Sequence, residues 1–137
     1  MQTWEDALEA YDQNLAGVVL SNHGGRQLDF ARSGIEVLVE VVENFKEKRG
    51  ITFPNDRFQL FVDGGVRRAT DVLKAVALGA TAGASLNPWN AAENIDLVLV
   101  GIGRPFLYAF STYGVDGVDH ALQILQVSCL AKYLSHP

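Results

Sequence analysis

The sequence predicts an α/β fold built on a parallel sheet, and three observations support this prediction. Short apolar segments at 17–20 and 58–62 have the length of buried strands. Each of them is followed directly by a polar turn that contains two glycines. Segments with apolar residues at helical spacing separate the strands, and this alternation is typical of βα units whose strands run parallel.

The first two expected elements are a helix and a strand. A helix is predicted over 2–13, where the apolar residues recur at spacings of three and four: Trp4, Ala7, Leu8 and Tyr11. Thr3 stands where its hydroxyl can cap the helix N-terminus. The strand at 17–20 is apolar at consecutive positions, which predicts a parallel strand covered on both faces.

Two further βα units are expected downstream. A second helix over 35–45 leads into a charged end and stops at Gly50. The second strand, 58–62, is followed by a third helix over 70–78 with Gly79 as its C-cap. An apolar stretch at 95–102 predicts the third strand, and apolar residues at helical spacing predict a last helix over about 118–134.

Composition limits the classes of function. The chain has 137 residues, of which 48% are hydrophobic and 20% charged, as in a globular domain. A net charge of -5 argues against nucleic acid or an anionic membrane as a partner. No stretch is long enough to span a bilayer, and no segment has the order of a signal peptide. Cys129 is the single cysteine and cannot form an intramolecular disulfide.

The turn after the first strand carries the residues best suited to chemistry. His23 carries an imidazole that can accept a proton, and Arg26 can hold a carboxylate through two parallel hydrogen bonds. A histidine alone in such a place is more often an ordinary surface or core residue. Because His23 shares a glycine-containing turn with Arg26, we interpret the pair as a base and an anchor for an acidic substrate.

Two later turns combine glycine with arginine. Asp63, Gly64, Gly65, Val66 and Arg67 follow the second strand, and Gly103 and Arg104 follow the third. Amides exposed by glycines beside a helix N-terminus bind phosphate, and an arginine adds charge. One such turn is more often structural only, whereas two after successive strands predict a phosphate site. Arg68, Tyr108, Tyr113, His120 and His136 lie outside these motifs and are given no role.

The segments 21–29 (SNHGGRQLD), 63–68 (DGGVRR) and 103–106 (GRPF) resemble the FMN-dependent α-hydroxy acid dehydrogenase and oxidase family. The likeness is nearest to L-lactate cytochrome c dehydrogenases, followed by glycolate oxidases. It implies oxidation of a short L-2-hydroxy acid, such as L-lactate, to the 2-oxo acid with FMN as cofactor. His23 then corresponds to the active-site base and Arg26 to the carboxylate anchor. The cofactor residues implied are Ser21, Asp63, Gly64, Gly65, Val66, Arg67, Gly103 and Arg104, and no metal is expected.

The resemblance also carries expectations about the whole enzyme. Its electron acceptor would be a cytochrome or oxygen, the full-length protein would be a homo-oligomer, and its location would be mitochondrial or cytoplasmic. The family fold is a TIM (β/α)8 barrel, which takes about 250 residues. Residues 1–137 match its last three βα units with the preceding helix, so a partial barrel is predicted. Since upstream strands are lacking, the alternative is a truncated, non-catalytic fragment of such an enzyme.

Two segments depart from the family pattern. An atypical insertion is expected at about 83–100, because removing 83–99 would join Ala82 to Val100 and restore the family sequence before Gly101. An atypical tail begins at about 127, where the resemblance stops. Codons that could encode splice signals at both places suggest retained intron sequence as a hypothesis. The insertion is predicted to have no fixed place in the fold and to form a surface excursion or a disordered loop.

Overall fold

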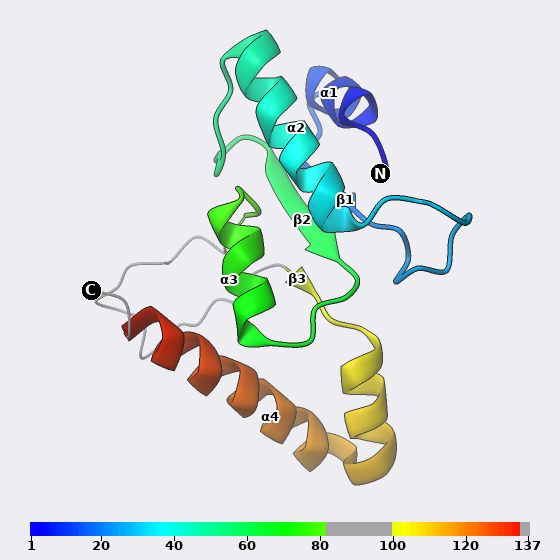
Figure 1. Cartoon of the computed structure of the whole chain (residues 1–137), viewed down its shortest axis with the longest axis vertical. Coiled ribbons are helices and arrows are strands. Elements are labelled where there is room, and N and C mark those ends of the chain that lie inside the picture. Colours follow the sequence, from blue (N-terminus) through cyan, green and yellow to red (C-terminus); the bar gives the residue numbers. More distant parts are fainter. Residues whose placement is uncertain (82–99, 135–137) are drawn as a thin grey trace.

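The computed structural model describes residues 1–81 and 100–134. The elements in chain order are α1 (Trp4–Asp12), β1 (Gly17–Leu20), α2 (Gly34–Arg49), β2 (Gln59–Asp63), α3 (Ala69–Ala77), β3 (Val100–Gly101) and α4 (Arg104–Leu134). Figure 1 shows α1 and α2 at one end of the molecule and the long α4 at the other. The alternation of strands and helices confirms the predicted α/β class.

The sheet has three parallel strands in the order β1-β2-β3. β1 pairs with β2 from Gly17 opposite Gln59 to Leu20 opposite Val62. β3 joins at the end of β2, where Val62 lies opposite Val100. Parallel strands end at the same edge of a sheet, so the loops after all three strands start side by side. Within the described ranges this sheet is open and does not close into a barrel.

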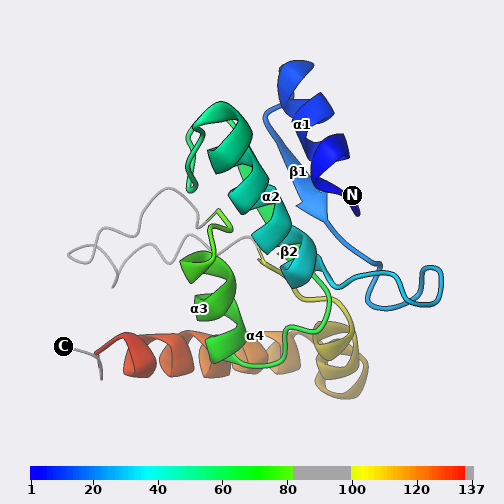
Figure 2. The ribbon, with the colours of Figure 1, turned by 45° about the horizontal axis from the view of Figure 1, so that its top comes forward.

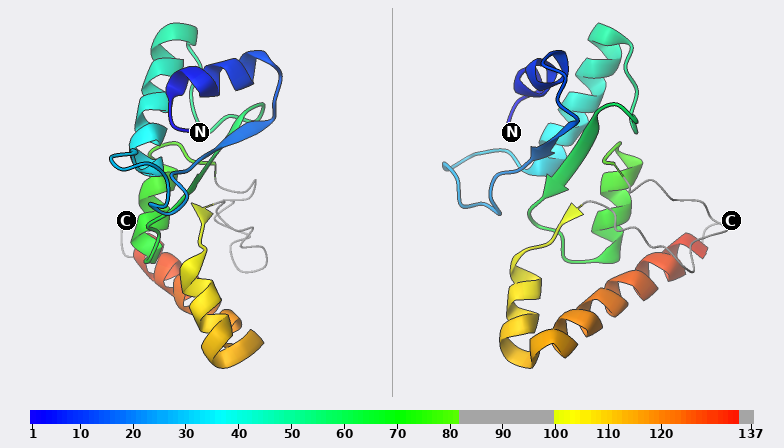
Figure 3. Two further views of the ribbon diagram at one scale, coloured as in Figure 1. Left: turned by 90° about the vertical axis from the view of Figure 1, so that its right-hand side faces the viewer. Right: turned by 180° about the vertical axis from the view of Figure 1, so that it is seen from behind.

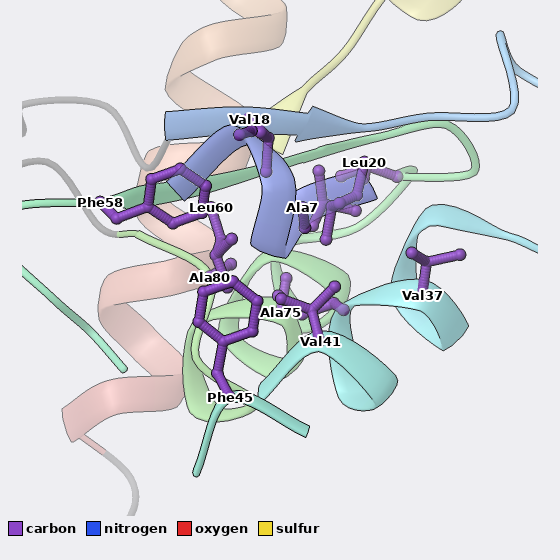
Figure 4. Packing of buried hydrophobic residues seen from close by; sticks show 14 of the residues in the cluster. Ala7, Val18, Leu20, Val37, Val41, Phe45, Phe58, Leu60, Ala75 and Ala80 are labelled. Atoms are coloured by element: carbon purple, nitrogen blue, oxygen red, sulfur yellow. The ribbon is translucent and has the colours of Figure 1, made fainter. Parts of the chain in front are cut away.

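Helices α1, α2 and α3 pack on one face of the sheet. The strand residues Val18, Leu20, Leu60 and Val62 are buried with apolar residues of these helices, and Figure 4 shows Ala7, Val41, Phe45 and Ala75 around them. In the left view of Figure 3, α2 and α3 lie on the same side of the strands.

None of the described helices packs on the opposite face of the sheet. Val19 points to this face and is 50% exposed, whereas its neighbours Val18 and Leu20 are buried. The prediction that 17–20 is covered on both faces is therefore wrong for this chain. The strand has the apolar sequence of a doubly covered strand, but within the described part of the chain a layer packs on only one of its faces.

The helix ends follow the sequence signals closely. The Thr3 hydroxyl accepts a hydrogen bond from the Asp6 amide (3.2 Å), which confirms the predicted N-cap. Gly50 ends α2 in the left-handed conformation with φ of 66°. In α3 the C-cap is Leu78 rather than Gly79, which follows it with φ of 105°. This shift of the α3 C-cap by one residue leaves the order of elements unchanged.

α4 extends well before the helix predicted over about 118–134. It starts at Arg104, and the amides of Phe106 and Leu107 donate to the Gly103 carbonyl. Pro105 is tolerated because the first turn of a helix needs no intrahelical amide donors. Gly114, whose φ of 64° and ψ of -148° are not helical, divides α4 into two helical segments that meet at a kink, and the predicted helix lies within the second. Figure 2 shows the later part of α4 passing beneath α3.

Two sequence predictions fall largely outside the described residues. Of the third strand expected at 95–102, the structure describes Val100–Gly101 as strand. The insertion expected at about 83–100 lies outside the described ranges except for Val100. Among the helices that are described, none combines the length and the apolar character needed to cross a membrane.

The free side of β1 contacts the residues that precede α1. The Met1 ammonium group donates to the Val19 carbonyl (2.7 Å), and the Ser21 amide donates to the Met1 carbonyl (3.4 Å). In a parallel pair of strands, the amide and the carbonyl of one residue bond to the two residues that flank its partner on the next strand. Met1 therefore lies beside Leu20 as a residue of a parallel strand would.

Candidate active site

A cavity of about 980 Å³ lies at the edge of the sheet where the strands end. The loops after β1, β2 and β3 supply residues 22–26, 63–67 and 101–105 to its wall, and Ser33, Leu107 and Tyr108 complete it. Ligand sites in open parallel sheets lie at this edge. The volume is that of pockets that hold a small molecule or cofactor.

The turn after β1 presents His23 in an unusual backbone conformation. His23, Gly24 and Gly25 have φ of 57°, 64° and 78°, which places three successive residues in the left-handed region. The His23 amide donates to the Ser21 hydroxyl (3.0 Å), and the Gly25 amide donates to the Asn22 side-chain oxygen (2.9 Å). A left-handed non-glycine residue costs about 1 kcal/mol or more and is found where the surroundings hold it.

The loop after β2 is open toward the cavity. Gly64 and Gly65 have φ of 83° and 79°, and a Cβ built on Gly65 would meet no atom within 4 Å. A Cβ on Gly64 would lie 3.4 Å from the Asn22 side-chain oxygen, so this loop adjoins the His23 turn. Small residues here leave the backbone accessible to a ligand.

Asp71 in the first turn of α3 holds this loop in place. Its carboxylate accepts hydrogen bonds from the amides of Arg67 (3.1 Å) and Arg68 (3.0 Å). These bonds, that of Arg67 foremost, hold the pKa of Asp71 below its ordinary value. The sequence analysis missed Asp71, although an acid three residues after a helix N-cap is a known capping signal.

The loop after β3 brings Arg104 back to the His23 turn. The Arg104 guanidinium donates to the Gly24 carbonyl, and a Cβ built on Gly24 would lie 2.7 Å from Arg104 Nη2. Gly103 has open space around it, since a Cβ there would meet nothing within 4 Å. The first and third loops are therefore in direct contact across the cavity.

The lining of the cavity fits a ligand that carries a phosphate and hydroxyl groups. Arg67 and Arg104 supply two guanidinium groups, and glycines leave backbone beside them exposed. The Oδ1 atom of Asp63 is buried and has no hydrogen-bond partner within the described part of the chain. A buried carboxylate oxygen requires a donor, which a ligand hydroxyl could provide. The same part of the chain contains no group of three or more His, Cys, Asp or Glu able to hold a metal ion.

Most of the residues predicted from sequence meet in this cavity. Those that line it are His23, Arg26, Asp63, Gly64, Gly65, Val66, Arg67, Gly103 and Arg104. Ser21 does not line it but accepts from the His23 amide. Tyr108, which was given no role, is part of the wall. Its spacing of four from Arg104 on one helix would have indicated this, had the helix been predicted to start at residue 104.

The fold and the cavity define a parallel α/β protein with a candidate ligand site at the carboxyl ends of the strands. A family model for FMN-dependent dehydrogenases matches residues 1–94. The chain is 50% identical to the L-lactate dehydrogenase (cytochrome) of Wickerhamomyces anomalus over 92% of its own length, and 40% identical to a peroxisomal (S)-2-hydroxyacid oxidase of Arabidopsis thaliana over 90%. The chain therefore belongs to the FMN-dependent dehydrogenase family, whose members are FMN-dependent enzymes.

Solved structures give the same result. The flavin-binding domain of baker's yeast flavocytochrome b2 superposes with a TM-score of 0.78 at 46% identity over 98% of this chain. A mandelate oxidase variant superposes with a TM-score of 0.70 at 38% identity. The chain spans 18% of the Wickerhamomyces relative, 27% of the Arabidopsis relative and 29% of the flavocytochrome b2 chain. It thus corresponds to a minor part of the length of these proteins.

Proposed function

We propose that this chain is the C-terminal part of a TIM barrel that oxidises a short L-2-hydroxy acid to the 2-oxo acid with FMN. One observation carries the proposal. The loops after the three parallel strands bring Arg67 and Arg104, which suit a phosphate, into the same cavity as His23 and Arg26, which suit an acidic substrate. Neither pair alone would distinguish this enzyme from other phosphate-binding α/β proteins.

The proposed division of labour follows from the chemistry of each group. Arg67 and Arg104 bind the phosphate of FMN together with the open backbone of Gly64 and Gly65, and Asp63 accepts from a hydroxyl of the cofactor. Val66 and Gly103 shape the wall around this end. Ser21 holds the His23 amide and thereby supports the turn.

At the substrate end, Arg26 binds the carboxylate in a bidentate manner and so fixes the carbon that carries the hydroxyl. His23 accepts the proton that leaves this carbon or its hydroxyl. Bound FMN supplies the two-electron acceptor for the oxidation. The positioned base is expected to contribute a rate factor of about 10²–10⁴.

L-lactate is the substrate that we propose first, with a cytochrome as electron acceptor. The support is the identity of 50% and 48% to two L-lactate dehydrogenases (cytochrome), compared with 41% to a plant 2-hydroxyacid oxidase. Oxygen as the acceptor is the alternative that the oxidase relatives suggest.

The open sheet supports a second candidate, in which this polypeptide alone is a non-catalytic fragment. Val19 is half-exposed on the sheet face that no described helix covers, and Met1 lies beside Leu20 as part of a further parallel strand would. Further strands would continue the sheet beyond this edge of β1, and its closure into a barrel would bury the Val19 face and complete an active site. The proposed chemistry then belongs to the completed barrel.

Flavin binding tests the proposed phosphate site in this chain. We expect the purified chain to bind FMN more tightly than riboflavin, which lacks the phosphate, when quenching of flavin fluorescence is followed in titrations. The double variant Arg67→Gln/Arg104→Gln should remove this preference, since each arginine contributes about 1.5–3 kcal/mol of charge-assisted bonding. Equal affinities for the two flavins in the unmodified chain would contradict the phosphate site.

Catalysis is best tested in a chimera in which the upstream strands of a relative precede this chain. Arg26→Lys keeps the charge but loses the planar pair of donors, so lactate binding should weaken while flavin stays bound. His23→Gln keeps the bulk but removes the base, so flavin reduction in stopped-flow measurements should slow by about 10²–10⁴. A His23→Gln chimera that reduces its flavin at the parent rate would contradict the proposed base.

A further inference from the structure

We propose that Arg104 is a positioning residue for the His23 turn in addition to its role at the phosphate. The inference rests on the proposed function and assigns to Arg104 a mechanical link between the phosphate end and the substrate end of the cavity. Through this link, occupation of the phosphate site orders the turn that presents His23.

The contact that carries this inference joins distant parts of the chain. The Arg104 guanidinium donates to the Gly24 carbonyl, and the two residues are 80 positions apart in the sequence. Arg104 belongs to the first turn of α4, whereas Gly24 belongs to the loop after β1. A bond of this kind fixes the loop to a helix, which is more rigid than the loop itself.

The turn needs such support. His23, Gly24 and Gly25 are all left-handed, and His23 is a residue type that pays for this conformation. Hydrogen bonds to Ser21 and Asn22 hold the turn from within. The hydrogen bond from Arg104 on α4 to the Gly24 carbonyl adds a contact from another element, next to the proposed base His23.

The guanidinium has enough donors for both tasks. Arginine presents five N–H groups in a planar fork, so the group that faces Gly24 leaves others for a phosphate. A phosphate bound by the remaining donors would immobilise the side chain, and the Gly24 carbonyl would be held more firmly as a result. Phosphate binding and the order of the His23 turn are then coupled.

Arg67 offers a matched control on the other side of the same cavity. Both arginines line it, but the Arg67 amide donates to Asp71 on α3, and within the described residues the Arg67 side chain makes no hydrogen bond to the His23 turn. Arg67→Gln and Arg104→Gln remove the same charge. The coupling predicts that the turn responds to the second change alone.

The test uses the full chain labelled with ¹⁵N, with amide exchange and NMR shifts followed during titration with inorganic phosphate. Both variants should weaken phosphate binding by about tenfold or more. Without phosphate, Arg104→Gln should speed exchange of the His23, Gly24 and Gly25 amides by about tenfold, whereas Arg67→Gln should leave these rates unchanged. Phosphate should slow these rates in the unmodified chain and fail to do so in Arg104→Gln.

The outcomes distinguish the coupling from the phosphate site itself. Unchanged exchange at 23–25 in Arg104→Gln, or the same acceleration in both variants, would overturn the coupling. Absence of phosphate binding in the unmodified chain would contradict the proposed function, while the comparison without phosphate would still test the hold on the turn. Arg104→Lys keeps a charged donor group on a flexible stem and should restore part of the protection, which a general loss of folding would not allow.

Discussion

Thr81 is bonded twice to Leu60 in the middle of β2. The Thr81 amide donates to the Leu60 carbonyl (2.8 Å), and the Thr81 hydroxyl accepts from the Leu60 amide (2.9 Å). Val100 pairs with Val62, two positions further along the same strand. Thr81 and Val100 are therefore bonded to positions on β2 that are only two residues apart. In an uninterrupted strand, one or two residues would be enough to connect Thr81 to Val100.

This relationship predicts that residues 83–99 can be deleted without loss of the fold. Joining Ala82 to Val100 leaves one residue to connect the two anchored positions. A shorter connection lowers the entropic cost of bringing the two anchored positions together, so the variant should be more stable by about 2 kcal/mol at most. Urea denaturation measures the change.

The contrary outcome is a loss of cooperative unfolding in the deletion variant. That result would mean that the fold needs the deleted residues, contrary to the close anchoring of Thr81 and Val100 on β2. Removal of 79–81 is the matched control, because it takes away the anchor at Leu60 itself and should destabilise the chain.

The Thr81 hydroxyl is expected to contribute to stability through the Leu60 amide. Thr81 is 6% exposed, so Thr81→Val leaves this amide buried without an acceptor at a cost of about 1–3 kcal/mol. Thr81→Ser keeps the hydroxyl and should cost less than Thr81→Val. Equal denaturation midpoints for Val and Ser would show that the hydrogen bond carries no stability.

The order of elements could be predicted from the sequence because local signals coincide with it. Thr3 and Gly50 mark helix ends by their own chemistry, and the apolar strands precede glycine turns. The start of α4 could not be predicted in this way. Pro105 and Gly114 both interrupt the helical pattern of the sequence. Pro105 is nevertheless tolerated in the first turn of α4, and Gly114 is the kink at which the two helical segments of α4 meet.

The candidate site was predictable where a residue carries its own chemistry. His23, Arg26, Arg67 and Arg104 are recognisable as such, and parallel strands bring their loops together. The bond from Arg104 to Gly24 depends on the path of the third loop across the sheet edge, which no local pattern contains. The exposure of Val19 likewise depends on which elements pack against the sheet, and not on the sequence of the strand.

Gly34 is expected to be essential for packing at the sheet edge. A Cβ at this position would lie 2.5 Å from the Leu20 carbonyl oxygen and 3.1 Å from that of Asp63, both of which are backbone atoms. Gly34→Ala should therefore cost about 2–3 kcal/mol, since the strand ends must shift. Thermal unfolding followed by circular dichroism measures this loss.

Gly103→Ala is the matched comparison for the same measurement. A Cβ there meets no atom within 4 Å, so stability should change by less than about 0.5 kcal/mol. The added methyl group nevertheless enters the cavity wall, and FMN binding should weaken. Equal destabilisation by the two substitutions would contradict the close approach of Gly34 to the strands.

Asp71 makes the loop after β2 sensitive to acid. Its carboxylate accepts from the Arg67 and Arg68 amides, and its pKa in the folded chain is lower than the ordinary aspartate value of about 4. A lowered folded-state pKa means that the stabilisation is fully present above this ordinary value. It is lost as the pH falls through the folded-state pKa, because the folded chain must then take up a proton against the hydrogen bonds.

Asp71→Asn should accordingly lose stability at pH 7 and not at acid pH. The amide keeps a neutral acceptor but removes the charge at the N-terminus of α3, so the loss at pH 7 should be about 0.5–1 kcal/mol. Glu36, whose pKa is also lowered by its bonds to Ser33, is present in both proteins and cancels in the difference. Urea denaturation at a series of pH values gives this difference, which should shrink toward zero as the pH falls through the folded-state pKa of Asp71. A difference in stability that stays constant across the pH series would mean that the Asp71 charge does not hold the loop. In that case Asp71→Asn should also keep its affinity for phosphate at the Arg67 side of the cavity.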